Sequence, residues 1–151
     1  IPDNKEMAAY ADSIFESAHD LFFPLNPTIN VLVGENHLNH KKNLINEILP
    51  KACNNFEKLL RKYEGNFFLG DQVYYCDFNV YHHLSLALLL KSTVLDNYPR
   101  LKQFIINFEA LEGIKKYLDT RAELVGIGTW PKVIINGKEY TSGTNPSYKY
   151  L

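Results

Sequence analysis

The sequence predicts an all-α protein, a bundle of five to six helices followed by an irregular tail that contains a β-hairpin. Two observations support the bundle: apolar residues recur at steps of three and four along most of the first 120 residues, and one segment is apolar on nearly every side. A third observation separates the tail, where glycine and proline are concentrated. We therefore divide the chain into a helical domain, residues 1–125, and a tail, residues 126–151.

The first two helical patterns are each limited by prolines. The first covers residues 4–23, where Pro24 and Pro27 are expected to end it, so that residues 24–34 form a loop. The second runs from residue 36 to residue 63 and is interrupted by Pro50. Because an interior proline costs about 3 kcal/mol in a straight helix, we expect a kink there or two abutting helices.

The apolar segment, residues 75–92, is expected to be the buried central helix. The break before it, residues 65–71, contains an apolar triplet expected to anchor the loop to the core: Phe67, Phe68 and Leu69. Asp77 falls in the first turn of the helix. A carboxylate there suits the positive end of the helix dipole and can bond free backbone N–H groups, so Asp77 is predicted to be a structural helix cap.

Two shorter helices and a hairpin complete the chain. Tyr98-Pro99 opens a helix, and Gly113 is expected to separate it from a last helix at residues 114–120. In the tail, Asn136-Gly137 stands between two β-type runs, residues 133–135 and 138–140. This pattern is a strong hairpin signal.

Composition excludes several functional classes. The 16 basic and 17 acidic residues give a net charge of −1, which argues against nucleic acid as a partner. No apolar run approaches the roughly 20 residues of a membrane-spanning helix. The two cysteines, Cys53 and Cys76, lie in apolar surroundings, which favours core residues in a reducing compartment over a disulfide.

Catalytic and metal motifs are absent from the sequence. There is no glycine-rich phosphate loop and no GxSxG, HExxH or CxxC motif. His37 and His40 could face one metal ion, but two imidazoles are too few for a site, so we expect none. Adjacent His82 and His83 point about 100° apart, and we interpret them as one hydrogen-bonded core histidine and one boundary histidine.

The segment from Phe68 to Phe78, FLGDQVYYCDF, resembles the approach to the central helix of cytosolic glutathione transferases. Two other segments resemble the mu-, pi- and sigma-like classes of that family: the Ile48-Leu49-Pro50 run, and the stretch from Tyr98 to Leu118. The resemblance covers about residues 4–121 and implies that residues 1–125 form the C-terminal helical domain of this family. One position departs from the family pattern, because Tyr74 stands where a capping Ser or Thr is expected; such a cap is typically worth about 1 kcal/mol.

The resemblance implies a domain that this chain lacks. Family members place a thioredoxin-like domain before the bundle, and that domain holds most of the glutathione site and the residue that activates the thiol. The start at Ile1-Pro2 is consistent with a cut near the interdomain linker. We therefore expect the 151 residues alone to be catalytically silent, with no catalytic residue of their own.

The resemblance also implies candidate site residues. Glu16, one turn after Asp12, matches an acidic residue that contacts the α-amino group of the glutathione bound across the dimer; the family usually has Asp there. A solvated glutamate on a helix face is an equal alternative. The co-substrate pocket maps to the end of the first helix and to the tail, which contribute His19, Phe22, Phe23 and Trp130. Ordinary core or loop packing is the alternative for each of these four residues.

Two functional hypotheses follow. In the first, the chain is part of a cytoplasmic, homodimeric glutathione S-transferase that conjugates glutathione, its co-substrate, to small electrophilic or hydrophobic molecules, a reaction typical of detoxification. The bundle would supply the electrophile site, and its first two helices the dimer contacts. In the second, the same fold is a non-catalytic module for protein association. Glutathione binding and conjugation by the full-length protein separate the two.

Overall fold

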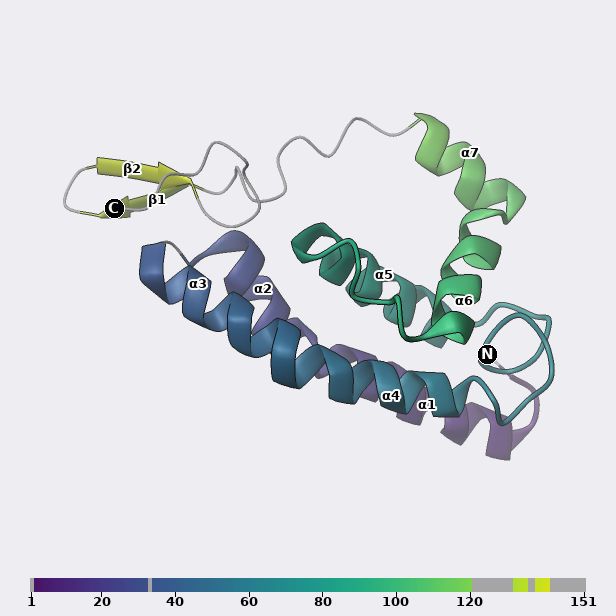
Figure 1. The fold of residues 1–151 in the computed structure, drawn as a ribbon. Coiled ribbons are helices and arrows are strands. Elements are labelled where there is room, and N and C mark those ends of the chain that lie inside the picture. The colour runs from purple at the N-terminus through teal and green to yellow at the C-terminus, as the bar shows by residue number, and fades with distance from the viewer. Residues whose placement is uncertain (1, 33, 121–131, 136–137, 142–151) are drawn as a thin grey trace.

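The computed structural model describes residues 2–32, 34–120, 132–135 and 138–141 (Figure 1). Its helices are α1 (Lys5–His19), α2 (Phe22–Asn30), α3 (Gly34–Asn43), the π-helical turn η1 (Leu44–Ile48), α4 (Leu49–Leu59), α5 (Tyr75–Leu90), α6 (Pro99–Glu109) and α7 (Glu112–Thr120). The strands β1 (Lys132–Ile135) and β2 (Lys138–Thr141) follow. The predicted all-α fold is thus confirmed, and the antiparallel pair of β1 and β2 lies where the hairpin was predicted.

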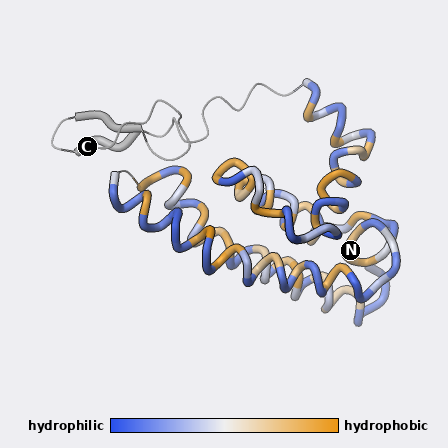
Figure 2. Tube along the Cα trace, viewed as in Figure 1, coloured by the Kyte–Doolittle hydropathy of each residue, from blue (hydrophilic) through white to orange (hydrophobic). Residues whose placement is uncertain are grey.

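The helices form a layer of two long rods with a second group packed on it. The first rod is α1 and α2, and the second is α3, η1 and α4, which runs alongside it (Figure 1). Helix α5 packs on α1 and α2, α6 packs on α4, and α7 continues from α6 away from the rods (Figure 1). Figure 2 shows the second rod changing from a largely hydrophilic α3 to a mixed α4. Of the described helices, none has the length and apolar content to cross a bilayer.

The prediction of a loop at residues 24–34 is wrong, because residues 22–30 form α2. Pro24 is the third residue of this helix. A backbone N–H at this position would have no intrahelical acceptor, so the absence of an N–H in proline costs no helical hydrogen bond. Pro27 does remove one interior bond. Burial of Leu25, Thr28 and Ile29 offsets that loss, and Oγ1 of Thr28 donates to the Pro24 carbonyl at 2.7 Å. Tertiary packing therefore overrides the local signal of the two prolines.

The expected discontinuity at Pro50 is confirmed and takes the form of a π-helical turn. Leu49 N–H bonds the carbonyl of Leu44, five residues back, and α4 begins at Leu49. Pro50 is thereby placed in the first turn of a new helix, where its missing N–H costs little. The rod can then continue through the proline.

The loop before α5 is anchored as predicted. Phe67, Phe68 and Leu69 are buried, and the Phe68 ring lies 5.3 Å from Phe104 and 6.2 Å from Phe56, measured between ring centroids. Gly65 has a φ of +132°, and a Cβ atom there would lie 2.4 Å from the carbonyl carbon of Gly70. Only glycine fits this close backbone approach.

Asp77 ties the same loop to α5. Its carboxylate is fully buried and accepts hydrogen bonds from Tyr74 N–H at 2.8 Å and Phe68 N–H at 3.0 Å. Burial raises the pKa of this carboxyl group, while the backbone hydrogen bonds act in the opposite direction. The Tyr74 hydroxyl donates instead to the Gln72 side chain, so Asp77 carries the side-chain capping of α5 in place of the serine or threonine of the family pattern.

Helix α6 begins at Pro99, as predicted, and a carboxylate from α4 caps it. The buried Glu57 accepts from Arg100 N–H at 3.2 Å and from Leu101 N–H at 3.0 Å. The break before the last helix falls at Ala110–Leu111 and not at Gly113, which is the second residue of α7. Backbone freedom matters little in the first turn of a helix, so Gly113 does not mark the boundary.

Candidate functional site

The turn between α1 and α2 gathers three predicted pocket residues into one cluster. Leu21 N–H bonds the Ala18 carbonyl, which closes a tight turn after His19. The rings of His19 and Phe22 are stacked with centroids 5.7 Å apart, and Phe23 meets them edge-on at 6.1 and 5.8 Å. Phe22 and Phe23 remain 42% and 68% exposed. We call these three residues the aromatic cluster.

The cluster extends along α1 to Phe15, which the sequence analysis did not single out. The Phe15 ring lies parallel to His19 at 6.5 Å and tilted to Tyr75 at 5.7 Å. Phe15 precedes His19 by four residues, so aromatic spacing along one helix face was the available signal. It links the cluster to the start of α5.

The two carboxylates of α1 have different surroundings. Asp12 accepts a hydrogen bond from the Tyr75 hydroxyl, and this bond raises the pKa of Tyr75 to about 12. Glu16 is exposed, and its carboxylate makes no ion pair with any described residue. Since residues three apart are neighbours on a helix surface, Glu16 lies beside His19 of the aromatic cluster. Of these two carboxylates, Glu16 is the one left available to a ligand.

A cavity of about 250 Å³ lies between α2 and α5, and we call it the α2–α5 pocket. Its lining is Phe22, Leu25, Asn26, Ile29, Asn30, His82, His83 and Leu86. Phe22 belongs both to this pocket and to the aromatic cluster. The interpretation of the two histidines is confirmed, since His83 is 3% exposed and bonded to the Asn79 carbonyl, whereas His82 is exposed.

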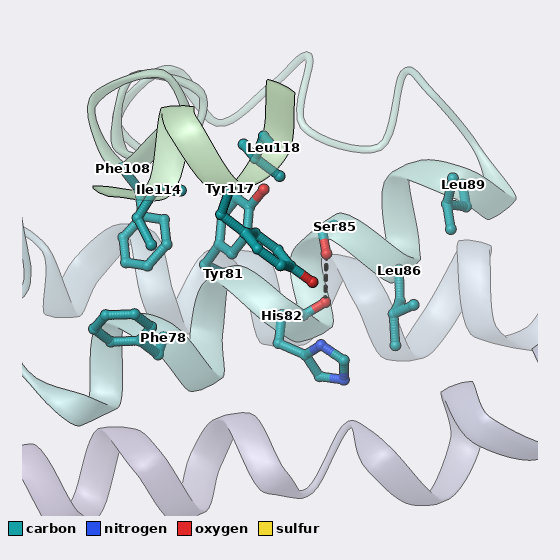
Figure 3. A pocket seen from close by; sticks show the side chains of 10 residues that line it. All are labelled: Phe78, Tyr81, His82, Ser85, Leu86, Leu89, Phe108, Ile114, Tyr117 and Leu118. Atoms are coloured by element: carbon teal, nitrogen blue, oxygen red, sulfur yellow. Dashed lines mark hydrogen bonds between the residues drawn. The ribbon is translucent and has the colours of Figure 1, made fainter. Parts of the chain in front are cut away.

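A second cavity, of about 550 Å³, lies between α5, α6 and α7, and we call it the α5–α7 pocket (Figure 3). Its lining is Phe78, Tyr81, His82, Ser85, Leu86, Leu89, Phe108, Ile114, Tyr117 and Leu118. The Tyr81 ring stacks on Phe108 at 4.5 Å, and its hydroxyl donates to Glu109 at 3.0 Å. In Figure 3, His82 and Leu86 point away from α7; both residues also line the α2–α5 pocket.

The sequence analysis did not predict the α5–α7 pocket. It interpreted α5 as buried on every side, but Phe78 and Leu89 are 50% and 48% exposed and form part of the pocket wall. Hydrophobicity around a helix shows only that each face avoids water. It does not show whether a neighbouring helix or an open cavity lies against that face.

The remaining candidates have structural explanations or lie outside the description. Trp130 lies outside the described residues. In the described part of the chain, no three His, Cys, Asp or Glu side chains are placed to hold a metal ion together. His37 is buried and bonded to the Thr28 carbonyl, and burial lowers its pKa. Burial also raises the pKa of the Cys53 and Cys76 thiols to about 12, which removes them as nucleophiles near neutral pH.

Comparison with known proteins agrees with this geometry. A family profile described as "Glutathione S-transferase, C-terminal domain" matches residues 19–121. "Glutathione S-transferase P" of Caenorhabditis elegans is 28% identical over 90% of the chain and 62% of its own length. A glutathione S-transferase of Plasmodium yoelii yoelii is 35% identical over 77% of the chain and 53% of its own length.

A solved structure of the pi-class glutathione S-transferase of Onchocerca volvulus superposes with a TM-score of 0.73 at 27% identity, covering 91% of this chain and 62% of that one. The chain thus spans between about half and two thirds of the length of these relatives. Because the profile matches well over half of the chain, the protein belongs to the glutathione S-transferase family, of which these residues form the C-terminal domain.

Proposed function

We propose that this domain supplies the electrophile-binding surface of an enzyme that transfers glutathione to small hydrophobic electrophiles. The observation that carries the proposal is the aromatic cluster, where His19, Phe22 and Phe23 are in mutual contact and remain open to solvent. Solvent-exposed aromatic residues beside an apolar cavity are typical of a binding surface for small molecules.

In this proposal the glutathione site lies mainly on a thioredoxin-like domain that this chain does not contain. Glu16 contributes the carboxylate that pairs with the α-amino group of glutathione, because an ammonium group binds strongly to a carboxylate without another partner. The described residues contain no group suited to activating the glutathione thiol. The 151-residue chain alone is therefore expected to be inactive.

Conjugation kinetics of the full-length protein test the proposal. Phe23→Ala is expected to raise the KM for an aryl electrophile about three- to tenfold and to leave the KM for glutathione unchanged. Ile106→Ala is the matched control, because Ile106 is 59% exposed on α6, away from the cluster. An equal effect of the two variants would contradict the assignment of the cluster.

Glu16→Gln tests the glutathione contact in the same assay. It is expected to raise the KM for glutathione with little change for the electrophile, while Glu6→Gln, an exposed glutamate in the first turn of the same helix, changes neither. If the full-length protein neither binds glutathione-agarose nor conjugates an electrophile, the enzyme proposal fails. The non-catalytic protein-association module is then favoured.

We also propose that the enzyme is a cytoplasmic homodimer, with α1 and the α3–α4 rod at its interface. The outer face of α1 supports this proposal, because Asp12, Ser13 and Glu16 are exposed there and Glu16 would have to reach glutathione on the partner subunit. Sedimentation equilibrium of the full-length protein checks the assembly. A monomer at concentrations that support full activity would contradict both the dimer and the role of Glu16 across it.

A further inference from the structure

A hydrogen bond between two side chains joins the middle of α1 to the first residue of α5. The Tyr75 hydroxyl donates to the Asp12 carboxylate, although the two residues are 63 positions apart in sequence. Asp12 is exposed and Tyr75 is partly buried. An exposed hydrogen bond adds little to the stability of a fold, because water competes for both groups. The main consequence of this bond is the fixed position of the Tyr75 ring.

The Tyr75 ring packs against Phe15, which follows Asp12 by three residues on α1. The two ring centroids are 5.7 Å apart and the ring planes are tilted by 54°. A second contact from α5 holds the backbone of Phe15, because Nδ2 of Asn79 donates to the Phe15 carbonyl at 2.8 Å. Tyr75 and Asn79 are four residues apart and so lie on one face of α5. Asn79 thus fixes the backbone of Phe15, and Tyr75 packs on its ring.

Phe15 is also in contact with the aromatic cluster. Its ring lies parallel to His19 at 6.5 Å, and His19 in turn stacks on Phe22 at 5.7 Å. Aromatic rings at such separations have preferred mutual orientations. A change in the orientation of the Phe15 ring therefore changes the preferred orientation of His19. A continuous series of ring contacts thus leads from the Tyr75 hydroxyl to the aromatic cluster.

We propose that Asp12 and Tyr75 are a positioning pair for the aromatic cluster. Their hydrogen bond fixes the Tyr75 ring, this ring orients Phe15, and Phe15 orients the ring of His19. The pair thereby sets how well an aryl electrophile fits the cluster without touching it. This role rests on the proposed function, whereas the coupling between the ring positions does not.

Conjugation kinetics of the full-length protein test the role. Tyr75→Phe keeps the ring and its packing surface and removes only the hydroxyl. It is expected to raise the KM for an aryl electrophile about two- to fivefold, as for the loss of one hydrogen bond, and to leave the KM for glutathione unchanged. Tyr74→Phe is the matched control, because it makes the same change at the adjacent residue, whose hydroxyl donates to Gln72. It should change neither KM, and an unchanged electrophile KM in Tyr75→Phe would overturn the proposal.

Substitutions of Asp12 show whether the two side chains act together. Asp12→Ala should raise the electrophile KM as much as Tyr75→Phe, and the double variant should show no further rise, because both changes remove the same bond. Asp12→Asn keeps an oxygen that accepts from the hydroxyl, so it should restore most of the original KM. Additive effects of the two single changes would overturn the proposal. Equal effects of Asp12→Asn and Asp12→Ala would also overturn it, since Asp12 would then act through its charge.

NMR of the 151-residue chain gives a readout that does not depend on conjugation. The ring currents of Phe15 and Phe22 act on the carbon-bound protons of the His19 imidazole. Their resonances should move in Tyr75→Phe and stay in place in Tyr74→Phe. Unchanged His19 resonances in Tyr75→Phe would overturn the positioning pair and leave the proposed function. If they move but the full-length protein does not conjugate an electrophile, the proposed function fails and the coupling between the rings is retained.

Discussion

Removal of the Asp77 carboxylate tests the geometry that joins the residue 65–71 loop to α5. The two backbone groups that it accepts from, Phe68 N–H and Tyr74 N–H, lie at 3.0 and 2.8 Å from its oxygens. Asp77→Ala leaves both N–H groups without this acceptor. Solvent does not replace it easily, because Asp77 is fully buried. Each buried unpaired donor costs about 1–3 kcal/mol, so we expect the loss of both partners to lower the free energy of unfolding by about 2–6 kcal/mol.

Chemical denaturation of the 151-residue chain, followed by circular dichroism, measures this change. Asp71→Ala is the matched control: its carboxylate accepts from Asn66 N–H at 3.2 Å in the same loop but is exposed, so its loss should cost less than about 1 kcal/mol. Asp77→Asn keeps the shape and one acceptor and should fall between the two. Equal losses for Asp77→Ala and Asp71→Ala would refute the assignment of Asp77 as the buried cap.

Three further perturbations test other parts of the fold by the same unfolding measurement. Glu57→Ala strips the N–H groups at the start of α6 of their acceptor and should cost about 2–4 kcal/mol; a loss under 1 kcal/mol would contradict the cap from α4. Gly65→Ala should cost more than about 2 kcal/mol because of the Gly70 contact, whereas Gly113→Ala, whose Cβ meets nothing, should be neutral or stabilising. Burial, with neighbouring His82 and His19, lowers the pKa of His83 below 6.5, so its contribution to stability is full above pH 6.5 and is lost as the pH falls through the lowered pKa. His83→Phe should therefore flatten the acid side of the stability profile, and an unchanged pH slope would contradict the buried, neutral ring.

Helix order and fold class could be predicted from sequence because both depend on local periodicity. The apolar spacing, the Tyr98-Pro99 pair and the Asn136-Gly137 sequence signal each act within a few residues. The wrong prediction of a loop at residues 24–34 arises from contacts between residues distant in sequence. Two prolines are a strong local signal against a helix, but burial of Leu25 and Ile29 against the rest of the bundle decides the outcome. Such long-range packing is not encoded in a window around Pro27.

The candidate site also contains some features that could be predicted from sequence and others that could not. His19 and Phe22 were placed by resemblance near the end of one helix, and the tight turn after α1 brings their rings together. The two pockets could not be predicted, since each is a gap between helices whose spacing depends on side chains distant in sequence. The unpaired Nε2 atom of His83 could not be predicted either, because a histidine in an apolar helix ordinarily has hydrogen-bond partners, and only three-dimensional packing leaves Nε2 without a donor among the described residues.

Both pockets use the same helix, and this sharing decides which variants are informative. Two faces of α5 line the two cavities, and His82 and Leu86, between these faces, line both. A change in ligand binding caused by substitution of Leu86 therefore cannot be assigned to either pocket. His83 belongs to the α2–α5 pocket alone and Tyr117, 60% exposed on α7, to the α5–α7 pocket alone. Substitution of Tyr117 therefore reports on the α5–α7 pocket without altering the lining of the α2–α5 pocket.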